Sequence, residues 1–104
     1  MATQKLNPQE LNASLQELAS WAVKDDKLHR EYKFADFAHA MGFMATAAVL
    51  IEKMNHHPEW FNVYNRLLVD LTTHDAGGIT ERDLKLARLL DSIYSTPFDA
   101  SDSK

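Results

Sequence analysis

The chain has 104 residues, of which 45% are hydrophobic and 25% charged, a composition typical of a globular domain and not of a disordered or fibrous chain. The formal net charge of −4 argues against direct nucleic-acid binding, which needs clustered cations. The absence of cysteine excludes disulfides, thiolate metal sites and cysteine nucleophiles. We expect one domain over residues 1–104, with an ordered core at about 7–95 and a polar C-terminal tail.

The first predicted elements are a helix and a hairpin. Asn7 has the place of a helix cap, with Pro8 at the first helical position and Glu10 three residues after the cap. Residues 21–24 and 28–34 alternate in polarity on either side of a polar turn, which predicts two paired strands.

The longest helical pattern of the sequence begins at Asp36 and runs to Met54. It carries two apolar sets. The set that we expect to cover the sheet is Phe37, Met41, Met44, Ala48 and Ile51. For the second set we expect a contact between subunits, the alternative being that the last helix covers it within one subunit; its members are Phe43, Ala47 and Leu50.

Two more strands and a helix are predicted after Pro58, which cannot continue a helix. The strands span 60–64 and 67–73, so that His74 falls at a strand end, away from the core face. Thr80 is the expected cap of the last helix. This order, α-β-β-α-β-β-α, predicts an α+β fold in which a four-stranded antiparallel sheet has three helices on one face.

Three of the five histidines lie in connecting segments, where small domains often keep their functional sites. They are His56, His57 and His74. An imidazole gives or takes a proton near neutral pH, so such a group indicates proton transfer or a metal. The alternative is that they are surface histidines without a function.

A metal site is the weaker of these interpretations. Glu52 and His56 have the spacing of two ligands on one helical face, and His74 would complete a trio. His57 precedes a proline and is therefore expected to be extended, so the two neighbouring histidines would diverge instead of converging on one ion. We predict no metal.

The spacing of these candidate site residues resembles that of the pterin-4a-carbinolamine dehydratases. Their signature has a charged residue, three positions, His-His-Pro, five positions, an aromatic residue, nine positions, a histidine and, eight positions later, an aspartate. The matching residues are Glu52, His56, His57, Pro58, Tyr64, His74 and Asp83. The resemblance extends over residues 21–93, and departs from the family mainly in the first helix and the tail.

The resemblance implies an α+β enzyme that removes water from 4a-hydroxytetrahydropterin and yields quinonoid dihydropterin, without a metal or an organic cofactor. That reaction recycles the pterin used by aromatic amino-acid hydroxylases. Carried over by position, His56 and His74 perform the principal proton transfers, and His57 supports binding and acid-base chemistry.

Further substrate-binding residues are implied in the same way. Those flanking the histidines are Glu52, Asn55, Pro58, Trp60, Thr72, Thr73 and Asp75. Glu52 is expected to orient His56 across one helical turn. Trp60 and Tyr64 form either an aromatic wall near the pterin or part of the core. Asp83 either supports the site or completes a capping box with Thr80.

The family also implies assembly and an alternative role. Its members form dimers and tetramers, so we expect a homotetramer built from dimers. Some animal members bind a homeodomain transcription factor and stabilise its dimer, so the alternative function is that of a non-catalytic protein-binding module. We expect a cytoplasmic protein without a membrane or nucleic-acid partner, and a nuclear location only if that coactivator role exists.

Overall fold

The sheet consists of two hairpins joined through their inner strands, in the order β1-β2-β4-β3, and every neighbouring pair is antiparallel. The computed structural model describes residues 4–95, and the predicted polar tail lies outside them. The described elements are α1 (Pro8–Leu15), β1 (Ala22–Lys24), β2 (Lys27–Lys33), α2 (Phe37–Met54), β3 (Glu59–Val63), β4 (Arg66–Leu71), the 3₁₀ helix η1 (His74–Ala76) and α3 (Glu81–Ile93).

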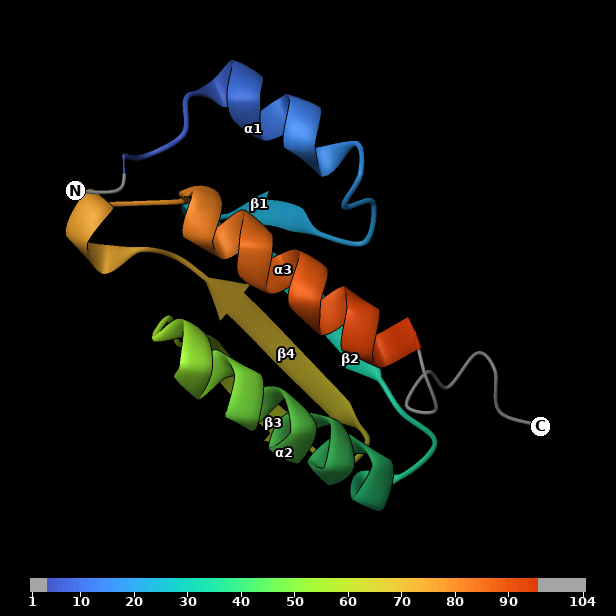
Figure 1. The fold of residues 1–104 in the computed structure, drawn as a ribbon. Helices are drawn as coiled ribbons and strands as arrows, with labels where there is room; N and C mark the ends of the chain where they lie inside the picture. The colour runs from blue at the N-terminus through green and yellow to red at the C-terminus, as the bar shows by residue number, and fades with distance from the viewer. Residues whose placement is uncertain (1–3, 96–104) are drawn as a thin grey trace.

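The predicted α+β class and element order are confirmed, and α2 and α3 lie across the same face of the sheet in Figure 1. The predicted caps Asn7 and Thr80 are present, and Asp36, where the long helical pattern begins, is a third cap. The Asn7 side chain accepts a hydrogen bond from the backbone N–H of Glu10 at 2.8 Å, and the Asp36 side chain accepts one from His39 at 2.8 Å. Thr80 caps α3. Hydrogen bonds between residues close in sequence determine where these helices begin, so the sequence alone can predict the helix starts.

The face of α2 that meets the sheet differs from the prediction. Its buried residues are Ala40, Phe43, Ala47 and Ile51. Phe37 and Met41, expected in the core, are 48% and 43% exposed. Phe43 is fully buried because its ring packs between Tyr32 and Phe34, at centroid distances of 5.0 and 5.2 Å.

The predicted subunit contact through Phe43 and Ala47 is therefore wrong, since both residues are fully buried within a single chain. The alternative, cover from the last helix, accounts for part of the set: the Phe43 ring also meets Tyr94, just beyond α3, and Leu50 faces Leu89 of α3 across a groove. The apolar residues left exposed on α2 are instead Phe37, Ala38, Met41, Ala45, Ala48 and Val49.

A polar cluster fixes the C-terminal half of α3 to the sheet. The Asp91 carboxylate accepts hydrogen bonds from Trp21 Nε1 at 3.0 Å, from Arg30 Nη1 at 2.6 Å and from the Tyr32 hydroxyl at 2.5 Å. Burial and the neighbouring carboxylate raise the pKa of Tyr32 well above its ordinary value. The Tyr32 hydroxyl therefore stays a hydrogen-bond donor at any physiological pH.

The β3–β4 turn differs from its predicted position, whereas α2 ends at the residue that the helical pattern indicated. The β3–β4 turn is formed by Tyr64 and Asn65, with Tyr64 in the left-handed region at φ 52°, whereas Tyr64 was expected within the strand. Helix α2 ends at Met54, because Asn55 is also left-handed, at φ 55°. The chain thus turns away from the helix axis before it reaches the histidines.

Within the described residues, no helix is long and apolar enough to cross a bilayer.

Candidate active site

The three histidines line one open cavity of about 260 Å³ between the end of α2, the η1 segment and the start of α3. Its complete lining is Asn55, His56, His57, Thr72, His74, Asp75 and Arg82. Six of these seven residues carry a sequence-based assignment to the site. The structure therefore brings together side chains from two segments that are separated by 14 residues of strand and turn (58–71).

His56 is the buried histidine of the cavity, with 8% of its surface exposed. The left-handed Asn55 directs the chain so that the His56 ring enters the space beside α3. There its Nε2 lies 2.6 Å from Oδ1 of Asp83, which is fully buried. A buried carboxylate beside one ring nitrogen fixes the orientation of the ring and leaves Nδ1 as the nitrogen available for proton transfer.

Asp83 contacts both a candidate site residue and the start of α3. Its Oδ2 accepts hydrogen bonds from the backbone N–H of Thr80 and from the Thr73 hydroxyl, both at 2.9 Å, while its Oδ1 holds His56. The first contact completes the capping box of α3. Because a buried carboxylate must be fully hydrogen-bonded, this set of donors holds the Asp83 side chain in place beside His56.

Glu52 contacts a different histidine from the one expected. Its Oε1 lies 2.9 Å from Nε2 of His57, and it does not contact His56. The prediction that Glu52 orients His56 is wrong because His56 lies beyond the end of α2, where the helical i,i+4 relationship no longer holds. The His57 and Glu52 side chains are 56% and 81% exposed, so solvent screens this pair.

His74 begins η1 and is the most exposed of the three, with 79% of its side chain accessible. Its Nε2 lies 3.2 Å from Oε2 of Glu59, whose other oxygen pairs with Lys27 Nζ at 2.5 Å. The hydrogen bond from Lys27 lowers the pKa of Glu59 despite some desolvation, and His74 contributes to the same effect. Each histidine of the cavity is thus paired with its own carboxylate.

The remaining predicted residues fall into two groups. Asn55, Thr72 and Asp75 line the cavity, where they offer amide, hydroxyl and carboxylate groups. Thr73 lies behind it and is bonded to Asp83. Trp60 does not line the cavity: it pairs with Val69 on the covered face of the sheet and packs against the core.

Pro58 also lies outside the cavity lining, and Tyr64 is in the β3–β4 turn with 62% of its surface exposed. Arg82 lines the cavity without having been assigned to it. Its place in the first turn of α3, one residue before Asp83, was the only signal in the sequence, and a signature built on histidines does not use it. It adds a cation to a cavity otherwise lined by histidines and neutral or acidic groups.

The arrangement is suited to acid-base chemistry on a small polar ring. Three imidazoles with different burial and different carboxylate partners meet at one cavity. Among residues 4–95, no cluster of three histidine, aspartate or glutamate side chains has the geometry of a metal site. A larger groove of about 550 Å³ lies between α2 and α3, but it contains no histidine or carboxylate.

Known proteins are similar to this chain in sequence. The sequence pattern of the family described as "Pterin 4 alpha carbinolamine dehydratase" matches residues 4–93. A Solibacter usitatus protein provisionally named as a pterin-4-alpha-carbinolamine dehydratase is 63% identical over 91 residues, which cover 88% of this chain and 96% of that protein. A Rhizobium johnstonii protein with the same provisional name is 50% identical over 93 residues, covering 88% and 92% of the two chains.

A solved structure has the same fold. The crystal structure of a "transcriptional coactivator/pterin dehydratase" from Brucella melitensis superimposes with a TM-score of 0.84 at 47% sequence identity. The match covers 86% of this chain and 98% of that one. The family match over residues 4–93 spans all the residues that line the histidine cavity.

Proposed function

The chain belongs to the pterin-4a-carbinolamine dehydratase family, and on that premise we propose that it is a hydro-lyase that dehydrates 4a-hydroxytetrahydropterin. The product would be quinonoid dihydropterin, returned to the tetrahydropterin pool that aromatic amino-acid hydroxylases use. The observation that carries the proposal is the convergence of His56, His57 and His74 on one cavity, each beside a carboxylate.

The reaction needs one proton donor and one proton acceptor. The C4a–O bond breaks as the leaving hydroxyl takes up a proton and departs as water. N5 then loses its proton, and a C4a–N5 double bond forms. The two protons balance, so the sum of the steps is the loss of one water molecule. Imidazoles near neutral pH serve either step, typically with rate gains of about 10²–10⁴ each.

The environments of the histidines support a division of roles. His56 is buried and fixed by Asp83, so it has the positioned ring that a principal acid or base needs. His74 is exposed beside the cavity and paired with Glu59, which suits exchange of a proton with the solvent. We assign the principal transfers to these two, and a binding and supporting role to His57.

Binding of the pterin ring would use the neutral and charged groups around the histidines. Asn55, Thr72 and Asp75 are placed to meet the edge of the ring with donors and acceptors, and Arg82 adds a donor for a carbonyl oxygen. The reaction that we propose requires no redox step.

The experiment is to follow the ultraviolet decay of freshly generated 4a-hydroxytetrahydropterin with and without the purified protein. We expect the wild type to accelerate the decay well above the buffer rate, and the double variant His56→Ala/His74→Ala to remove that acceleration. If the substrate decays no faster with the wild-type protein than in buffer alone, the proposal is wrong. Far-UV circular dichroism of both proteins checks that the variant is folded.

We also propose a homotetramer built from dimers. Supporting it is the row of apolar residues exposed along α2, where Phe37 is 48%, Met41 43% and Val49 70% exposed. Such a row on one helix face is unusual on an isolated small domain and is suited to packing against the same helix of another subunit.

The second candidate function is that of a protein-binding module, and the same row on α2 favours it. The Brucella melitensis relative is named both a coactivator and a dehydratase. If the cellular role depends on protein contacts, the double variant His56→Ala/His74→Ala will retain it, because those residues lie outside the row. If the role depends on dehydration, the variant will lose it.

A further inference from the structure

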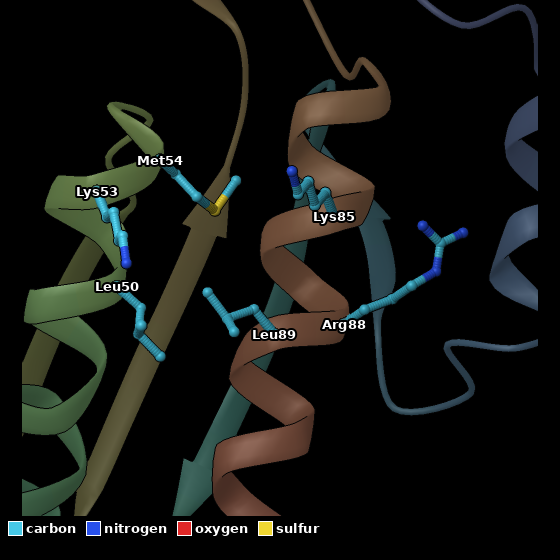
Figure 2. A pocket seen from close by; sticks show the side chains of 6 residues that line it. All are labelled: Leu50, Lys53, Met54, Lys85, Arg88 and Leu89. Carbon is cyan, nitrogen blue, oxygen red and sulfur yellow. The ribbon is translucent and has the colours of Figure 1, made fainter.

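A groove between α2 and α3 lies apart from the histidine cavity and shares no residue with it. It has a volume of about 550 Å³, within the range of roughly 300–1,000 Å³ that is typical of sites for small ligands. Figure 2 shows its lining, which is Leu50, Lys53, Met54, Lys85, Arg88 and Leu89.

The floor of the groove is apolar. Leu50 and Met54 from α2 and Leu89 from α3 are half-buried, and their side chains point into the space between the two helices (Figure 2). Met54 and Leu89 also pack against the core, and all three residues line the groove. An apolar ligand that covers them would remove this surface from water.

The charged groups that line the groove are all cations. Lys53 stands on α2 and Lys85 on α3, at the same end of the groove, while the Arg88 side chain leaves α3 on the side away from α2 (Figure 2). Within residues 4–95, none of the three forms an ion pair. No carboxylate lines the groove, although the chain as a whole has a net charge of −4.

We propose that this groove binds a small amphipathic carboxylate such as a medium-chain fatty acid. The carboxylate would lie between Lys53 and Lys85, and the hydrocarbon chain would lie on Leu50, Met54 and Leu89. The unpaired cations at one end suit the carboxylate head of such a ligand, and the apolar floor suits its hydrocarbon tail. The six lining residues offer a single compact apolar area, whereas a partner helix needs anchors over several turns.

The test is to titrate the full chain with decanoate and to monitor binding by isothermal titration calorimetry and by the NMR chemical shifts of the backbone amides. The uncharged analogue 1-decanol, with the same chain length, is the matched ligand. We expect saturable binding of one decanoate per chain, shifts confined to the facing sides of α2 and α3, and binding of decanol about tenfold weaker.

Two pairs of variants separate charge recognition from general electrostatics. Lys53→Gln/Lys85→Gln removes both charges but keeps unbranched polar side chains that are only one atom shorter, and it should weaken decanoate binding about tenfold without changing decanol binding. The control Lys24→Gln/Lys33→Gln removes two exposed lysines of the sheet by the same chemistry. It should leave both affinities unchanged.

Three results would overturn the proposal. One is the absence of saturable decanoate binding. Another is equal binding of decanoate and decanol, which would leave an apolar surface without anion recognition. The third is a change in the mass of the unliganded assembly on Lys53→Gln/Lys85→Gln, seen by light scattering, which would assign the groove to a contact between copies of the chain. None of these measurements depends on the proposed dehydratase activity.

Discussion

Nε2 of His56 and Oδ1 of Asp83 lie 2.6 Å apart and join the segment that follows α2 to the first turn of α3. The same carboxylate accepts the backbone N–H of Thr80 and thereby begins α3. Asp83 thus both completes the cap of α3 and orients the buried His56. Folding of α3 and orientation of His56 are consequently linked in one side chain.

Asp83→Asn should reduce both turnover and stability. An amide in place of the carboxylate keeps the shape, but it loses the charge that holds the His56 ring and accepts two further donors. We expect turnover to fall roughly 10–100-fold and the free energy of unfolding to fall by about 1–3 kcal/mol. The carbinolamine decay assay and urea denaturation measure the two effects.

Thr80→Ala is the control for that variant. It removes the hydroxyl that accepts a hydrogen bond from the Arg82 N–H and contacts the Thr73 hydroxyl at 2.7 Å, but both partners of the His56–Asp83 contact are retained. Stability should fall by about 1 kcal/mol, with turnover within a few-fold of wild type. Equal losses of turnover in the two variants would show that Asp83 acts on activity through helix stability alone.

His74→Gln should lower turnover, because the ring next to the cavity is replaced by an amide that does not titrate. We expect roughly a 100-fold loss, measured as kcat at saturating substrate. The matched control is His29→Gln, since His29 also pairs with a carboxylate, Asp70 at 2.8 Å, but on the sheet and outside the cavity. Its turnover should stay within a few-fold of wild type; a loss as large as that of His74→Gln would contradict the assignment.

The ion pair between Glu59 and Lys27 should contribute to stability only above acidic pH. Because Lys27 lowers the pKa of Glu59 in the folded chain, the contribution is fully present above the ordinary value of 4.5 and is lost as the pH falls through the lowered value. Chemical denaturation of wild type and Glu59→Gln from pH 7 to pH 3 checks this. The two stabilities should differ at pH 7 and converge towards pH 3; a constant difference would contradict the linkage.

The exposed row on α2 should control assembly. Met41→Glu/Val49→Glu places two charges in that row, and we expect a folded chain with a smaller mass by light scattering. Val23→Glu, at a comparably exposed site on β1, is the control and should keep the wild-type mass. An unchanged mass for the double variant would remove α2 from the interface, and circular dichroism distinguishes dissociation from unfolding.

Local features of the fold could be predicted because short-range chemistry determines them. The caps at Asn7, Asp36 and Thr80 each depend on a bond to a backbone group two or three residues away. The rotation of α2 about its axis could not be predicted, since two apolar sets of similar strength run along it. The choice is made by Phe43, whose ring fits among aromatic rings that are distant in sequence.

Six of the seven residues that line the cavity could be singled out from the sequence, whereas Arg82 and the carboxylate partners of the histidines could not. Spacing identified the three histidines, yet the partner of His56 depended on one backbone angle, the φ of 55° at Asn55, which ends the helical register. Once that register ends, Glu52 faces His57 and Asp83 faces His56. Such pairs arise from the path of the chain through space, which residue spacing does not encode.

The attachment of α3 at Asp83 near its start and at Asp91 near its end has an evolutionary consequence. A helix turns about 100° per residue, so inserting or deleting one residue between these aspartates would swing one of them away from its donors. Relatives that keep this arrangement should therefore vary in the length of their hairpin turns but not in the eight-residue interval between the two carboxylates. Gaps in an alignment of such relatives would be expected to avoid that interval.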